Sequence, residues 1–221
     1  MRRTPASWSG LLVLSLAASA SAAEKRIGLV GGGMWNNLPS LSGTTLVGEE
    51  ITLQPPNTRE FGPMGGGIFE FVFGDFGALR FEPKYIRKGA DVTVKLKSTG
   101  ELLSGPVDLD YASFGVMFRS TLFRKKPVQM ALISGLGANY LVKGRYQGED
   151  VKDAFNSFEL AISSRIGIQR KIGDTGLLGL HFAIESSINR IDQHQPGQAK
   201  LRNGGIGFAV EYTASLGGHV H

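Results

Sequence analysis

The chain contains no cysteine among its 221 residues. It can therefore form no disulfide, and no thiol can serve as a nucleophile or a metal ligand. Beyond the N-terminal segment it also lacks any apolar run of the roughly 20 residues that a membrane-spanning helix needs, and no long amphipathic helix stands out. If the protein enters a membrane it must do so with strands, closed into a barrel.

Glycine, in contrast, is abundant, with 31 residues in the chain. This is about twice the average usage and favours turns and closely packed strands over helices. The net charge of +5 and the 42% of hydrophobic residues suit a single domain with a core of its own.

The first 22 residues have the three parts of a bacterial secretory signal peptide. Arg2 and Arg3 precede an apolar run at 11–18, and Ala20-Ser21-Ala22 offers a small-x-small cleavage site. The alternative, an anchor helix, is disfavoured because the run is too short to span a bilayer. We expect residues 1–22 to be removed, leaving one domain at 23–221 with a charge of 5 − 2 = +3.

Residues 155–191 predict a β-hairpin. Apolar and other residues alternate with a period of two, and Gly173-Asp174-Thr175-Gly176 reverses the chain between the two halves. One face is aliphatic and aromatic, whereas the other combines small residues with isolated charges such as Arg165 and His181. This is the pattern of a transmembrane barrel, in which the apolar face meets lipid and the polar face lines the lumen.

The same alternation recurs along the chain and predicts eight strands. They are expected at 26–35, 65–73, 78–87, 109–123, 128–143, 158–169, 178–189 and 201–216. Long loops at 36–63, 88–107, 144–154 and 192–200 alternate with short turns at 74–77, 124–127 and 173–176. Within the second loop, residues 91–97 alternate well enough to extend the strand beyond the bilayer. The fold class is therefore all-β: an eight-stranded antiparallel up-and-down transmembrane β-barrel of the bacterial outer membrane, with both termini in the periplasm. The aromatic side chains of Trp35, Tyr85, Tyr140 and Tyr212 fit the membrane interface.

Charged residues gather at the inward positions of these strands. They are Glu70, Arg80, Glu82, Lys84, Arg119, Glu159, Arg165, His181, Glu185 and Glu211. The interior of an eight-stranded barrel is only wide enough for side chains, and buried ions must be paired. We expect an ion-paired plug and no open pore; the alternative use is an ion or proton path.

Two observations bear on catalysis and metal binding. His181 and Glu185 share a face, and Ser163 or Ser187 nearby would complete the triad of a lipid hydrolase, although a histidine in a polar lumen is more often structural. His194, His219 and His221 are not spaced like metal ligands. We therefore expect no enzymatic activity, no catalytic or cofactor-binding residue, no metal and no cofactor.

Nucleic-acid and nucleotide binding are disfavoured as well. The glycine runs at 31–33 and 65–67 lack the helix and the lysine that follow a phosphate loop. The cations at 124–126 form a turn that fits anionic lipid headgroups.

Four segments resemble the outer-membrane β-barrel domain family of PorT-like and related eight-stranded proteins. They are residues 79–89, the start of the strand at 109, Gly135 to Tyr140, and residues 179–192 ending in Ile-Asn-Arg-Ile-Asp. The resemblance extends from Arg26 to the end of the chain. It implies the barrel fold, an outer-membrane location and, by analogy, an accessory role in export or biogenesis.

The expected function is structural or adhesive, with surface recognition carried by the extracellular loops. The expected partners are outer-membrane lipids and lipopolysaccharide, the outer-membrane insertion machinery, and an extracellular ligand or protein at the loops. Two alternatives remain: an outer-membrane lipid-modifying hydrolase on the same fold, and a periplasmic lipocalin-like carrier of an apolar ligand.

Overall fold

The computed structural model describes residues 24–37, 42–46, 49–73, 77–96, 98–123, 125–189, 191 and 202–217. The expected signal peptide, most of the turn at 74–77, Arg124, the loop at 192–200 and the histidines at 194, 219 and 221 lie outside this part of the chain. Within it, no helix has the length and apolar character required to cross a membrane.

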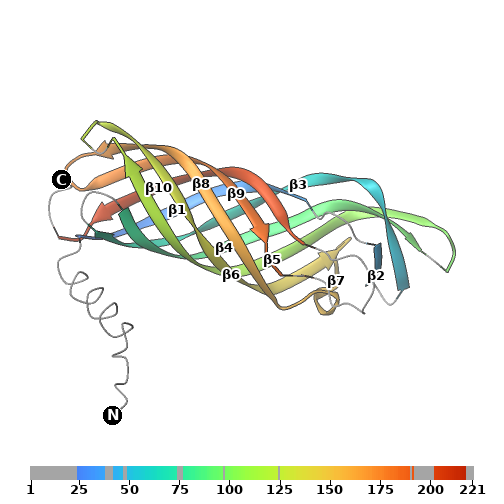
Figure 1. Ribbon diagram of the computed structural model, residues 1–221. Coiled ribbons are helices and arrows are strands. Elements are labelled where there is room, and N and C mark those ends of the chain that lie inside the picture. The colour runs from blue at the N-terminus through green and yellow to red at the C-terminus, as the bar shows by residue number, and fades with distance from the viewer. Residues whose placement is uncertain are drawn as a thin grey trace, which may run out of the picture.

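Eight long strands form a closed antiparallel barrel (Figure 1). They are β1 (Glu24–Asn37), β3 (Glu49–Phe73), β4 (Gly77–Leu96), β5 (Leu102–Leu122), β6 (Val128–Tyr146), β8 (Phe158–Ile172), β9 (Gly176–Ser187) and β10 (Gly204–Ser215). Each long strand pairs with the next along the chain, and β1 closes the cylinder by pairing with both β3 and β10. The predicted fold class is confirmed.

Three short elements lie at the end of the barrel where β3, β4 and β5 project, which we call the loop end (Figure 1). They are β2 (Ser42–Leu46), which pairs with β3, β7 (Glu149–Asp150), which pairs with β6, and the single-turn helix η1 (Lys152–Ala154). The opposite end, which holds the turn at 173–175, is called the turn end.

The long loop predicted at 36–63 is wrong in large part, whereas the strand extension predicted within 88–107 at residues 91–97 is confirmed as far as Leu96. Strand β3 already begins at Glu49, and β4 and β5 continue to Leu96 and from Leu102 as a hairpin. The prolines that suggested a loop coincide with irregular pairing of β3 with β4, which shifts register between Gln54 and Thr58 and again between Arg59 and Met64. Such shifts tolerate residues that cannot donate a ladder hydrogen bond.

The outward positions of the barrel carry the apolar side chains, as predicted. Phe158, Ile166, Leu180 and Phe208 are 40–53% exposed, whereas Arg165 and Glu185 point inward and are at most 5% exposed. The expected interfacial aromatics Trp35, Tyr85, Tyr140 and Tyr212 are all exposed on the outer face. An apolar outer band around a charged interior is the inverse of a water-soluble barrel.

Candidate functional site

The lumen of the barrel is the candidate site, because the charged residues predicted to face inward all lie there. Glu70, Arg80, Glu82, Lys84, Arg119, Glu159, Arg165, His181, Glu185 and Glu211 are each at most 7% exposed. The strand parity that the sequence suggested is therefore confirmed at every one of these positions. Their contacts form two centres along the barrel axis.

The first centre is built around Arg80 of β4. Its guanidinium lies 3.2 Å from Glu70 Oε1, 2.6 Å from Glu82 Oε1 and 2.6 Å from Glu211 Oε2. Glu70 is the direct partner of Arg80 in the neighbouring strand, whereas Glu211 comes from β10 on another wall. One guanidinium thus holds three carboxylates from three strands.

Two further arginines complete this centre. Arg165 of β8 donates two hydrogen bonds to Glu82, at 2.9 and 2.6 Å, and so spans the lumen from β8 to β4. Arg119 of β5 lies 3.2 Å from Glu70 Oε2. The bidentate Arg165–Glu82 pair satisfies both carboxylate oxygens with a planar partner, the strongest ion-pair geometry available to proteins.

The second centre lies nearer the loop end and is built around Lys88. Its ammonium group contacts Glu159 of β8 and lies 2.6 Å from Glu185 of β9. Lys84 contributes a second cation, 3.4 Å from Glu185. Asn203 donates a 2.6 Å hydrogen bond to Glu159, so the carboxylates are held from several sides.

Lys88 and Asn203 were missed by the sequence reasoning, which assigned the first to a loop. The alternation of Lys84, Ile86 and Lys88 continues the inward parity of β4 and was the available signal. Tyr111, also missed, lies beneath Lys88, whose Nζ is 5.4 Å from the ring centroid.

Among the residues that the structure describes, the buried charges of the lumen are nearly balanced. The inward cations are Arg26, Arg80, Lys84, Lys88, Arg119 and Arg165, and the inward carboxylates are Glu70, Glu82, Glu159, Glu185 and Glu211. Arg26 is matched by Glu24, whose Oε1 lies 2.7 Å from its Nε. Removing ions from water is tolerated only when such pairs form, and several of them, such as Arg80–Glu211 and Arg165–Glu82, join strands on different walls.

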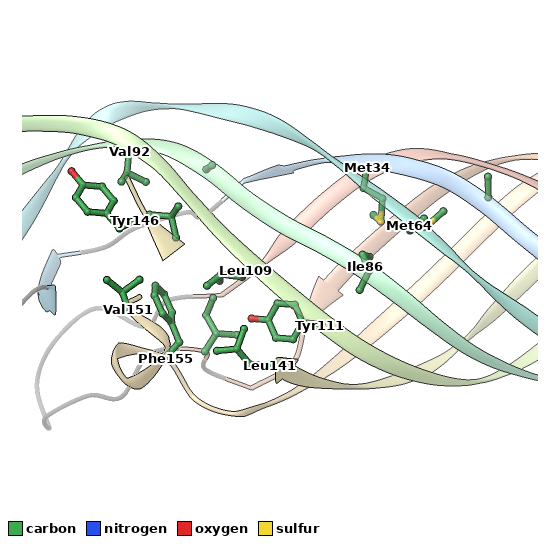
Figure 2. Close-up of a cluster of buried hydrophobic side chains, with 14 of the residues drawn as sticks. Met34, Met64, Ile86, Val92, Leu109, Tyr111, Leu141, Tyr146, Val151 and Phe155 are labelled. Atoms are coloured by element: carbon green, nitrogen blue, oxygen red, sulfur yellow. The ribbon is translucent and has the colours of Figure 1, made fainter. Parts of the chain in front are cut away.

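An apolar cluster runs along the interior of the barrel toward the loop end, and Figure 2 shows its members from Met34 and Ile86 to Val151 and Phe155. Val151 and Phe155, which flank η1, pack with Leu109, Leu141 and Tyr146 of β5 and β6. The η1 segment is fastened by backbone hydrogen bonds, from Val151 to Gly144 at 3.0 Å and from Leu141 to Ser157 at 2.8 Å. In the described part of the loop end, apolar side chains therefore pack together inside the barrel wall.

Three of the four residues of the hydrolase alternative are engaged elsewhere, whereas Ser163 is the direct partner of Glu185 in the β8–β9 register. His181 Nε2 lies 3.1 Å from Glu211, while Glu185 is bound by the two lysines. Ser187 accepts a hydrogen bond from the backbone of Asn203. Among the described residues, no group of three or more histidine or acidic side chains is arranged to hold a metal ion.

No family model matches the chain, and no curated protein matches it. The structure is similar to the outer membrane protein OprG from Pseudomonas aeruginosa, with a TM-score of 0.53 and 11% identity over 90% of this chain and 97% of that one. It is also similar to Neisserial surface protein A, with a TM-score of 0.50 and 14% identity over 85% and 95% of the two chains. The likeness does not extend to an identification as PorT-like. The chain is an all-β, closed, eight-stranded antiparallel barrel that matches bacterial outer-membrane proteins.

Proposed function

We propose that the protein is a non-conducting barrel of the bacterial outer membrane that acts in surface recognition or adhesion and has no enzymatic activity. The observation that carries this proposal is the filled lumen: two ion-paired centres cross it, and the apolar cluster packs inside it toward the loop end. A pore needs a continuous aqueous path, and an eight-stranded barrel has no room for one beside these side chains.

The proposal includes a location and an orientation. The outer face is apolar between Tyr212 near the turn end and Tyr140 near the loop end, as a lipid-facing band requires. Removal of a signal peptide at 1–22 would deliver residues 23–221 to the periplasm, with the loop end facing outward. Engagement of His181 by Glu211 supports a structural role for that histidine.

The closed lumen is tested by recording from the purified protein in planar lipid bilayers. We expect no steady conductance, because ions would have to displace buried salt bridges. Folding is verified by heat-modifiable migration in detergent gels, and a trimeric porin serves as a positive control for insertion. Large, steady single-channel currents from the folded protein would overturn the proposal.

Recognition is assigned to the part of the barrel that projects past the lipid-facing band. Strand β4 continues from Tyr85 to Leu96, 96 − 85 = 11 residues beyond the aromatic interface. At about 3.3 Å per residue, the hairpin of β4 and β5 extends roughly 36 Å along the strand direction. Surface loops on a rigid scaffold are the usual carriers of binding.

Shortening this hairpin tests the assignment. Asp91 and Pro106 are direct partners in the β4–β5 register, so residues 92–105 can be replaced by an Asn-Gly turn without disturbing the pairing below. Cells that display the shortened protein should adhere less to surfaces and to other cells than cells that display the full chain. Equal adhesion at equal display levels, with the barrel still heat-modifiable, would contradict a recognition role for this hairpin.

A further inference from the structure

We infer that the outer face of β4, β5 and β6, together with the adjoining η1 and just beyond the aromatic interface, binds the phosphate groups of lipopolysaccharide. The site consists of Arg87, Lys143, Arg145 and Lys152, which we call the basic crown. The inference rests on the proposed outer-membrane location, and it adds a lipid class and a set of residues to it.

The position of the crown is fixed by the register of three strands. Tyr85, Ala112 and Tyr140 are successive partners across β4, β5 and β6, and both tyrosines are exposed at the edge of the lipid-facing band. Arg87 lies two residues beyond Tyr85, and Lys143 lies three beyond Tyr140. Headgroup phosphates lie at this depth, immediately outside the aromatic interface.

Asp110 organises the arginine half of the crown. Arg87 Nε donates to Asp110 Oδ1 at 2.7 Å and the Tyr85 hydroxyl donates to the same oxygen at 2.7 Å, while Arg145 Nη2 lies 3.7 Å from Oδ2. Burial alone would raise the pKa of Asp110, but the hydrogen bonds from Arg87 and Tyr85 hold it below its ordinary value. The carboxylate therefore stays ionised and keeps Arg87 in place with part of its guanidinium exposed.

The two lysines supply the uncompensated charge. Lys143 is exposed opposite Asp110 in the β5–β6 register, and Lys152 Nζ lies 5.9 Å from the centre of the Tyr140 ring. Neither ammonium group forms a salt bridge with a carboxylate of the described residues. Lys152 thus lies over the interfacial Tyr140 and Lys143 is exposed three residues further along β6, where a lipid phosphate can approach.

Nearby carboxylates limit the role of Arg145. Asp108 of β5 and Asp150 of β7 are its direct partners in the two neighbouring strands. Asp150 also accepts a 2.9 Å hydrogen bond from the backbone N–H of Lys152, which positions the start of η1. The phosphate is therefore expected between Lys143, Lys152 and Arg87, with Arg145 behind them.

The test measures equilibrium binding of fluorescent lipopolysaccharide to the folded protein in a neutral detergent. The variant is Lys143→Gln with Lys152→Gln. Its matched control is Lys125→Gln with Lys126→Gln at the turn end, where Lys126 Nζ likewise lies 5.3 Å from the centre of an aromatic ring, Phe123. Both double variants remove two lysine charges, one of which lies over an aromatic ring, and they do so at opposite ends of the barrel.

We expect the crown variant to bind roughly thirtyfold more weakly, because each basic residue near an anionic surface contributes about 1 kcal/mol. The control should bind within about twofold of the unaltered protein, and dephosphorylated lipopolysaccharide should bind poorly to all three. Equal losses in both variants would show attraction by net charge alone and would overturn the inference. Equally tight, lysine-dependent binding of phosphatidylglycerol would overturn the choice of lipopolysaccharide.

The conductance recording separates this inference from the proposed function. The crown lies on the outer face, so the crown variant should remain as non-conducting and as heat-modifiable as the unaltered protein. A conducting protein would refute the closed barrel whatever its lipid binding, and a closed protein indifferent to Lys143 and Lys152 would refute the crown alone.

Discussion

At the scale of single residues, the ion pairs of the lumen stabilise the barrel only as pairs, because removing one partner leaves the other charge buried without it. Arg165→Met should lower the free energy of unfolding by about 3–5 kcal/mol, because it strips both hydrogen bonds from the buried Glu82 carboxylate. Adding Glu82→Gln should recover part of that loss, since the double variant leaves no unpaired charge at this pair. Urea unfolding of the folded barrel measures both; equal stability of the single and double variants would count against the pair.

Outside the membrane-spanning part, Asp110 should make stability depend on pH. Its folded pKa is depressed by the hydrogen bonds from Arg87 and Tyr85, which outweigh burial. Its contribution is therefore present above its unfolded pKa of about 3.9 and is lost as the pH falls through the lower folded pKa. Asp110→Asn should lower the free energy of unfolding by about 1 kcal/mol at pH 7 and leave it unchanged at strongly acidic pH.

The comparison is made by urea unfolding between about pH 7 and pH 2. Asp174→Asn, which alters an exposed carboxylate in the turn at the opposite end, serves as the control. A penalty for Asp110→Asn that persists unchanged into acid would show that the ionised carboxylate is not what matters.

At the scale of the element, two adjacent glycines of β1 should respond in opposite ways to the same substitution. A Cβ on Gly31 would meet nothing within 4 Å, whereas a Cβ on Gly32 would lie 2.2 Å from the carbonyl oxygen of Phe208 in β10. Gly31→Ala should leave stability unchanged or raise it by up to about 1 kcal/mol. Gly32→Ala should lower it by about 1–3 kcal/mol, and similar midpoints for the two variants in urea would contradict the close approach.

The sequence predicted the parity of the strands better than their ends. Successive residues of a strand point to opposite faces, so the alternation of apolar and polar residues predicted that Glu82 and Arg165 point inward. Pro55, Pro56 and Pro63 suggested a loop, since a proline within a ladder is normally disfavoured, yet β3 absorbs them where its register shifts. The partners themselves could not be predicted, because Arg80 and Glu211 meet only once every strand has taken its place around the cylinder.

At the scale of the whole molecule, Trp35 reports how the barrel sits in a bilayer. The sequence has two tryptophans, at 8 and 35, and the expected cleavage removes the first. Trp35 is 43% exposed and packs against Phe61 and Phe208 on the lipid-facing side, with ring centroids 5.2 and 6.0 Å away. Its fluorescence should be quenched more strongly by lipids brominated near the headgroup than by lipids brominated near the chain ends. The reverse order would place Trp35 at the bilayer centre and displace the whole lipid-facing band.

The pairing of β1 with both β3 and β10 also determines when during folding the barrel can close. Gly28 and Thr213 are ladder partners although 213 − 28 = 185 positions separate them, so the seam cannot form until the final strand has been synthesised and exported. Until then, two unpaired strand edges and the whole apolar outer face are exposed to aggregation. The contacts between β1 and β10 that end this state form slowly, because they join residues far apart in the sequence. A chain that lacks part of the last strand could not close the barrel. We expect such a chain to be degraded by periplasmic proteases instead of entering the outer membrane.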